Sequence, residues 1–188
     1  VLRGEDLRFS NDGVKDTTRA VILPLWNAYS FLSTYAEADG WKPSEALVGG
    51  KAPAVTGELD RWIISRLHTL LKDVHVEMEG YHLYNVVPRV IGFIEDLTNW
   101  YIRLSRRRFW AGEKLMSPDT AAAYQTLYYV LVEFSKLFAP LAPFTAERIY
   151  QGLTEGLATA ANLVPESVHL SDMPMPVEKL IDAGLERR

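Results

Sequence analysis

The chain has 188 residues, no cysteine and a formal net charge of −4 at pH 7. This length suits one domain with its own core. The lack of cysteine excludes disulfides and thiolate zinc sites and is typical of the reducing cytoplasm, while the acidic balance argues against a general polyanion binder. No apolar run reaches the ~20 residues of a membrane span. The chain begins with Val1 and not with Met, and its first residues lack the apolar stretch of a secretory signal. We therefore expect part of a longer, cytoplasmic protein with no membrane association.

The first half of the chain predicts two helices separated by a loop. Apolar residues recur at steps of three and four over Val14–Ala36, and Pro24 inside this run should kink or split the helix. Residues 40–57 are rich in glycine and proline, which indicates a surface loop. A second helix is predicted over Glu58–Met78, with Gly80 ending it.

The second half predicts three more helices and no alternating strand pattern. They run over Asn85–Trp110, from the N-cap Ser117 to Phe138, and over Phe144–Leu157. Residues 158–176 are expected to be irregular, and a last short helix should begin near Val177. The predicted fold class is therefore an all-α bundle of about five helices with the fourth helix the most buried. Residues 1–176 form the bundle, and residues 177–188 are assigned to the start of a following C-terminal segment.

The helix over Asn85–Trp110 carries the most information about function. At 100° per residue, one face gathers the apolar side chains and is expected to be the core. This predicted core face consists of Val86, Val90, Phe93, Leu97, Trp100, Tyr101 and Leu104. The opposite side carries Asn99, Arg103, Arg106 and Trp110, with Arg107 and Asp96 at its flanks. Arg108 falls back towards the core face, so its stem should be packed.

Indole and guanidinium groups side by side on a polar helix face suit looped or single-stranded RNA. Guanidinium groups bind phosphate with two hydrogen bonds, and an indole is a platform for an unstacked base. Asn99, Arg103, Arg106, Arg107 and Trp110 are therefore the candidate RNA-binding residues. The spacing equally suits a basic helix end that the helix dipole favours, with Arg103 paired to Asp96 or Glu147.

The remaining polar residues predict no catalytic residue, cofactor site or metal site in this chain. His68 and His75 lie seven residues apart without further ligands nearby in the sequence, so we expect satisfied or solvent-facing histidines. Asn27, close to Pro24, could contact a base, but we expect it to bond backbone carbonyls that the kink frees. The sequence contains neither a nucleophile elbow nor a glycine-rich phosphate loop.

Segments along the whole chain resemble the helical anticodon-binding domain of class I aminoacyl-tRNA synthetases of the isoleucine–valine–leucine–methionine subgroup. The most specific match is Asn99–Trp110, which resembles the isoleucine enzymes of the eukaryote-like branch. Further similar segments are Arg3–Ser10 with Gly13–Lys15, Leu23–Phe31, Leu137–Glu147 and Ser167–Asp172.

This resemblance implies recognition of the anticodon stem-loop of isoleucine tRNA, in a monomeric parent enzyme that joins isoleucine to its tRNA with ATP and magnesium. The family's two ATP-binding signatures, of the His-Ile-Gly-His and Lys-Met-Ser-Lys-Ser types, do not occur in this chain. Lys114-Leu115-Met116-Ser117 lacks the second lysine of the latter, and Ser117 is already explained as an N-cap. The fragment alone is therefore expected not to be an enzyme and to depend on the rest of the synthetase. A sister synthetase for valine or leucine and a protein-docking helical scaffold are the alternatives.

Overall fold

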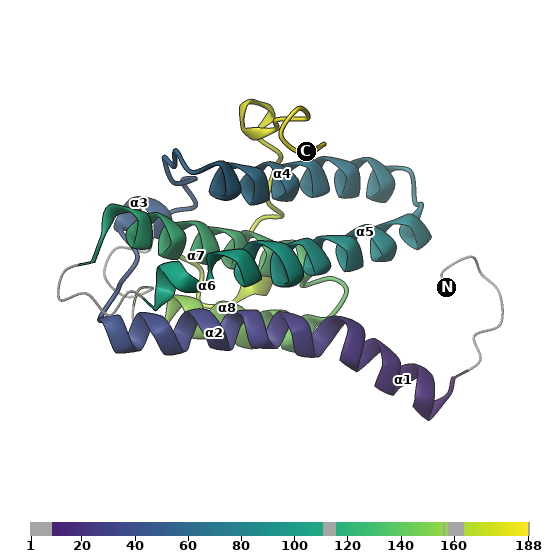
Figure 1. Cartoon of the computed structure of the whole chain (residues 1–188). Coiled ribbons are helices and arrows are strands. Elements are labelled where there is room, and N and C mark those ends of the chain that lie inside the picture. The colour runs from purple at the N-terminus through teal and green to yellow at the C-terminus, as the bar shows by residue number, and fades with distance from the viewer. Residues whose placement is uncertain (1–8, 111–115, 156, 158–163, 188) are drawn as a thin grey trace.

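The computed structural model describes residues 9–110, 116–155, 157 and 164–187, and the regular elements in this part of the chain are all helical. The elements are α1 (Asn11–Thr17), the π turn η1 (Thr18–Ile22), α2 (Leu23–Asp39), α3 (Glu45–Val48), α4 (Glu58–Glu79), α5 (Leu83–Glu95), the π turn η2 (Asp96–Ile102), α6 (Arg103–Phe109), α7 (Pro118–Phe138), α8 (Pro143–Thr154) and the 3-10 turns η3 (Val168–Leu170) and η4 (Glu178–Leu180). In Figure 1, α4 lies above a middle level of α5, α6 and α7, and α2 and α8 lie below. The predicted all-α bundle is confirmed.

The first predicted helix is present, and it passes Pro24 without a break. Proline has no N–H to give to the preceding turn. The turn before it is π-helical, and the N–H of Leu23 bonds the carbonyl of Thr18, five residues back. A bend between α1 and α2 is visible in Figure 1. The helix ends at Gly40, which takes the left-handed conformation at φ 65°.

The segment 40–57 is not entirely loop, as the sequence suggested, because it contains the short helix α3. Ser44 caps this helix by accepting a hydrogen bond from the N–H of Leu47. Leu47 and Val48 are buried and join the core. Two apolar side chains therefore fasten this connection to the bundle.

The core is built around α7, as predicted. Most of its side chains are buried, because α2, α4, α6 and α8 all pack against it. Ser117 is the expected N-cap and accepts a hydrogen bond from the N–H of Thr120 at 3.0 Å. A helix covered on so many sides must be apolar nearly all round.

The predicted core face of the third helix is only partly right in its second half, where Tyr101 is buried as expected but two other residues are not. Val86, Val90, Phe93 and Leu97 are buried, but Trp100 and Leu104 are each 59% exposed, and Ser105 and Phe109 are buried in their place. The cause is η2. A π turn takes an extra residue per hydrogen-bonded turn, so the side chains after it point to different sides than regular 100° steps would give. The hydroxyl of Thr98 in this turn donates to the carbonyl of Ile94 at 2.7 Å.

Residues 177–187 lie along α4, on the side away from α2, at the top of Figure 1. The N–H of Val177 donates to Nδ1 of His68, and the N–H of Asp182 donates to Oγ of Ser65. The carboxylate of Glu186 accepts from Thr69 at 2.8 Å and pairs with Arg66. The predicted helix near Val177 is only the 3-10 turn η4. The assignment of residues 177–188 to a following segment stays a prediction.

Some sequence features lie outside the described residues, namely Arg3–Arg8 of the first similar segment, Lys114 and Leu115. No helix among those that the structure describes has both the length and the apolar character needed to cross a bilayer.

Candidate nucleic-acid interface

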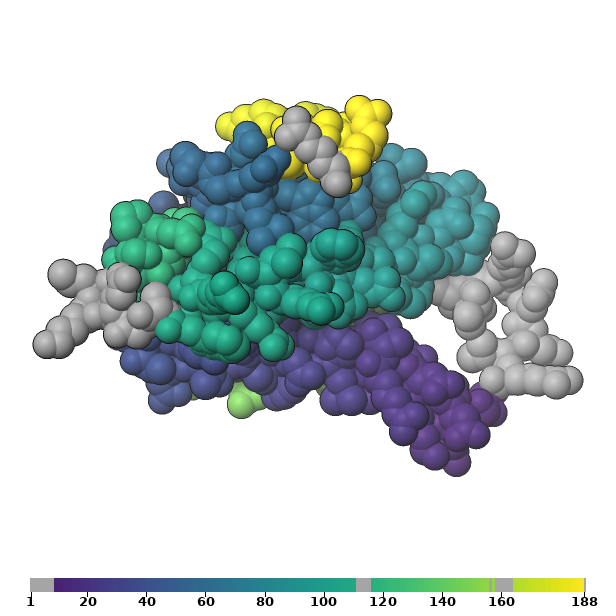
Figure 2. Space-filling view, viewed as in Figure 1, coloured from purple at the N-terminus to yellow at the C-terminus, as the bar shows by residue number. Residues whose placement is uncertain are grey.

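The predicted RNA-binding residues all lie on the surface of η2, α6 and the residue that follows α6. The side chains of Asn99, Arg103, Arg106, Arg107 and Trp110 are exposed. Figure 2 shows this helix as a ridge across the front of the molecule, with α4 above it and α2 below it. We call these five residues the basic ridge.

The three arginines of the basic ridge form no ion pair with any described residue. The pairing of Arg103 with Asp96 or Glu147 does not occur, because other groups hold both carboxylates. Arg66 of α4 pairs with Asp96 at 2.8 Å. Glu147 accepts hydrogen bonds from Ser167 and from the N–H of Val168. Three guanidinium groups thus remain available to an anionic partner.

Arg108 is the exception among the neighbouring arginines, and it anchors α6 to the bundle. Its two terminal nitrogens donate to the two carboxylate oxygens of Asp60, each at 2.7 Å. Asp60 is fully buried and also accepts from the hydroxyl of Tyr101 at 2.8 Å. Burial alone would lower the pKa of Arg108, but its hydrogen bonds and charge interaction with Asp60 outweigh this effect and raise the pKa. The guanidinium is therefore held charged, and its packed stem confirms the sequence prediction.

A groove of about 410 Å³ separates the basic ridge from η1 and α2. Asn99 and Arg106 line it from one side, and Arg19 and Asn27 line it from the other. The side chain of Asn27 makes no hydrogen bond to any described residue, so the backbone role expected for it is not found. The amide and guanidinium groups of these four side chains suit RNA backbone and base edges. Glu95 and Thr98 line the same groove, so it also holds one carboxylate.

Trp110 joins the end of the ridge to α2. Its indole N–H donates to the hydroxyl of Tyr35, yet the side chain is still 55% exposed. The hydrogen bond fixes the ring at one edge and leaves surface for contact with a partner. A ring held in this way loses little freedom when a base stacks on it.

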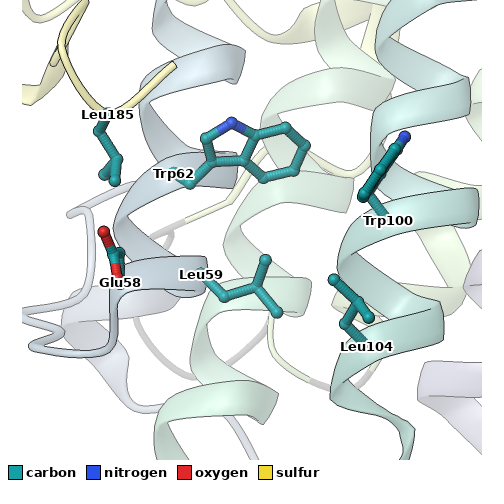
Figure 3. A pocket seen from close by; sticks show the side chains of 6 residues that line it. All are labelled: Glu58, Leu59, Trp62, Trp100, Leu104 and Leu185. Carbon is teal, nitrogen blue, oxygen red and sulfur yellow. The ribbon is translucent and has the colours of Figure 1, made fainter. Parts of the chain in front are cut away.

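A second hollow lies on the other side of the ridge, towards α4. It measures about 530 Å³ and is lined by Glu58, Leu59, Trp62, Trp100, Leu104 and Leu185. Figure 3 shows Trp62 and Trp100 on opposite sides of it, with Leu59 and Leu104 beside them. The lining is mainly apolar, and it includes the two side chains that the sequence wrongly placed in the core.

The two histidines of α4 are satisfied, as expected. His68 is buried, and its Nε2 lies 3.0 Å from the hydroxyl of Tyr129. Because Nδ1 accepts from Val177, Nε2 carries the proton, and burial lowers the pKa of His68 from 6.5 to about 4. His75 bonds the carbonyl of Pro174 at 2.9 Å. No cluster of possible metal ligands is found among the described residues.

Sequence reasoning missed Arg19 and Trp62 and misplaced Trp100. Arg19 and Trp62 belong to other helices, and their spacing along the chain gives no sign that they border the ridge. Trp100 fits the apolar spacing of the core face, but the π turn η2 directs its side chain away from the core. The only sign of this surface in the sequence was the unusual number of aromatic and arginine residues between Trp100 and Trp110.

Comparison with known proteins identifies the family of this chain. The family model for the anticodon-binding domain of tRNA ligase matches residues 60–188. Isoleucine–tRNA ligases of Chlamydia muridarum and Chlamydia pneumoniae are 47% and 45% identical over all 188 residues. The isoleucine–tRNA ligase of Protochlamydia amoebophila is 44% identical over 173 residues, which is 92% of this chain and 15% of that protein. The chain spans 17% of the length of the two Chlamydia relatives. This chain therefore belongs to the anticodon-binding domains of tRNA ligases, and it is homologous to isoleucine–tRNA ligases over its whole length.

Proposed function

We propose that the chain binds the anticodon stem-loop of isoleucine tRNA through the basic ridge. The observation that supports this proposal is the set of three exposed arginines that have no ion-pair partner in the part of the chain that the structure describes, next to an exposed tryptophan, in a chain with a net charge of −4. Phosphate contacts fix the position of an RNA on a protein, and contacts to splayed bases give selectivity. Arg103, Arg106 and Arg107 would hold the backbone, while Asn99 and Trp110 would meet bases.

The parent protein in this proposal is an isoleucine–tRNA ligase. It would join isoleucine to its tRNA with ATP and magnesium, at sites that lie in the rest of the synthetase. This chain would then contribute tRNA recognition and no catalytic group. The proposal includes a cytoplasmic location and a monomeric parent, with the rest of the synthetase as the partner in the same polypeptide.

A salt titration of hairpin binding tests the role of the ridge. The probe is an RNA hairpin with the sequence of the isoleucine-tRNA anticodon arm. Arg103→Ala or Arg106→Ala should weaken binding and lower the salt slope by about one unit, because one phosphate contact is lost. Arg148→Ala is the matched control, since Arg148 is an exposed arginine of α8 outside the ridge. Equal behaviour of all three folded variants would remove the ridge from the RNA interface.

The full-length ligase gives a second readout. Arg106→Ala and Trp110→Ala should raise the tRNA concentration needed for aminoacylation and leave isoleucine-dependent pyrophosphate exchange unchanged, because that exchange does not require tRNA. Normal aminoacylation at limiting tRNA by both variants would contradict the proposal.

A further inference from the structure

The hollow between α4 and the basic ridge exposes more apolar surface than a solvated helix face needs. Trp100 and Leu104 are each 59% exposed and stand one turn apart. Leu59 and Trp62 face them from α4 and are partly buried against the core. Single exposed apolar residues are ordinary on a protein surface, but a contiguous patch with a concave shape indicates a binding site.

The two indoles are placed as opposite sides of a slot. They form no ring contact with each other, and Figure 3 shows the space between them. One turn further along, the ion pair of Arg66 with Asp96 at 2.8 Å joins α4 to η2. At the other end, Arg108 and Asp60 join α6 to the start of α4. The separation of the two walls is therefore fixed on both sides of the slot.

The charges beside the hollow indicate what kind of partner fits it. Arg107 follows Leu104 by three residues within α6, so these two side chains lie on the same helix face, and Arg103 directly precedes Leu104. The lining of the hollow itself holds one charged residue, Glu58, on its α4 side. Neither arginine has an ion-pair partner among the described residues. A nucleotide matches this combination, because it has a flat apolar base and an anionic phosphate a short distance away. An apolar protein segment would use the hollow and leave both charges unpaired.

We propose that this hollow takes one unstacked nucleobase of an RNA loop, with the base against Trp100 and Trp62 and the adjoining phosphates on Arg103 and Arg107. The inference rests on the proposed function and adds a base-binding slot on the α4 side of the ridge. Its size of about 530 Å³ lies within the ~300–1,000 Å³ that is usual for small-ligand sites. Stacking accepts any base, so this slot would hold the loop open, and selectivity would come from other contacts.

The test replaces the flat ring and keeps the apolar character. Trp100→Leu should weaken binding of the anticodon-arm hairpin by about 5- to 150-fold and leave the salt slope unchanged, because a stacked base is lost and no phosphate contact is lost. Trp100→Phe keeps an aromatic face and should retain most of the affinity. Trp26→Leu is the matched control, since Trp26 is an exposed tryptophan of α2 that lines neither hollow. Circular dichroism and urea midpoints equal to those of the unchanged chain show that each variant is folded.

Abasic hairpins then show whether a base occupies the slot. A set of hairpins, each lacking one loop base, is titrated against the unchanged chain and against Trp100→Leu. At one loop position the two losses should not add, because both remove the same stacking contact. At the other positions they should add.

The outcomes separate this inference from the proposed function. If the arginine variants lose binding while Trp100→Leu binds every hairpin normally, the slot is not a base site and the ridge remains one. The inference is also wrong if Trp100→Leu and Trp100→Phe behave alike, or if the losses add at every loop position. If the unchanged chain shows no salt-dependent binding of the hairpin, both proposals fall.

Discussion

The replacement Asp60→Asn should cost the bundle much of its stability, although it changes a single side-chain atom. The carboxylate of Asp60 is fully buried, bonds both terminal nitrogens of Arg108 at 2.7 Å and accepts from Tyr101 at 2.8 Å. The amide would turn an N–H₂ group towards the guanidinium and leave a nearly buried positive charge with only Asp119. Loss of one partner from a buried pair costs about 3–5 kcal/mol, against the total of about 5–15 kcal/mol that holds a domain together.

Asp119→Asn is the matched control, because it removes a second carboxylate from the same guanidinium. Asp119 pairs with Arg108 at 2.9 Å, but its side chain is 67% exposed, so the loss should be only about 0–1 kcal/mol. The assay is a urea titration of both variants, in which unfolding is monitored by circular dichroism. A loss below about 1 kcal/mol for Asp60→Asn, or equal losses for the two variants, would refute the reasoning. Combining Asp60→Asn with Arg108→Met should recover part of the stability, since no unpaired charge remains.

Three further predictions concern the core, two glycines and a histidine. Leu97→Ala should cost about 2–5 kcal/mol in a denaturant titration, because Leu97 is fully buried, and a loss below about 1 kcal/mol would place it outside the core. Gly92→Ala should stabilise α5 by about 0.5–1 kcal/mol, since the added carbon meets nothing within 4 Å. Gly152→Ala should destabilise α8, since the added carbon would overlap the hydroxyl of Tyr29. A rise in Tm for both variants would contradict the close approach at α8. Burial lowers the pKa of His68 from 6.5 to about 4, so the unfolded chain takes up the proton at a higher pH than the folded chain. The free energy of unfolding should therefore fall by up to about 3 kcal/mol as the pH drops from 6.5 to about 4. His68→Gln should remove this part of the pH dependence, and an unchanged dependence of the urea midpoint on pH would show that His68 is not its source.

Local patterns were enough to predict the fold. The five expected helices correspond to α1 with α2, α4, α5 with α6, α7 and α8. Apolar periodicity located them, and short-range signals such as Ser117 and Gly80 placed some of their ends. These signals involve residues within one or two helical turns of each other, so they can be recognised in a single sequence.

The direction of individual side chains could not be predicted where a π turn intervenes. Trp100 and Tyr101 are adjacent aromatic residues, and a regular helix places both near the core face. The structure buries Tyr101, whose hydroxyl bonds Asp60, and exposes Trp100. The sequence does not indicate where an extra residue enters a helix, because the same apolar residues fit the pattern before and after it.

The candidate interface was predictable only on the helix that carries it. Arg103, Arg106 and Arg107 are far enough from the buried face to stay exposed despite the π turn. The residues across the two hollows, Arg19 and Trp62, come from helices whose placement beside the ridge depends on packing of the whole bundle. Tertiary neighbours of this kind are not encoded in the spacing of one segment.

The π turn at η2 makes the winding of this segment a determinant of surface chemistry. A regular helix turns by about 100° per residue, so regular winding of Asp96–Ile102 with no residue removed would rotate α6 by roughly that angle against α5. Phe109 would leave its buried position, Arg108 would turn away from Asp60, and the basic ridge would face a different part of the bundle. Removing one residue together with the π turn would compensate, because each side chain of α6 would return to about its present direction. A chain that is one residue shorter here can therefore keep the same interface on a regular helix, whereas the same ridge sequence on a regular helix without that deletion would present other side chains.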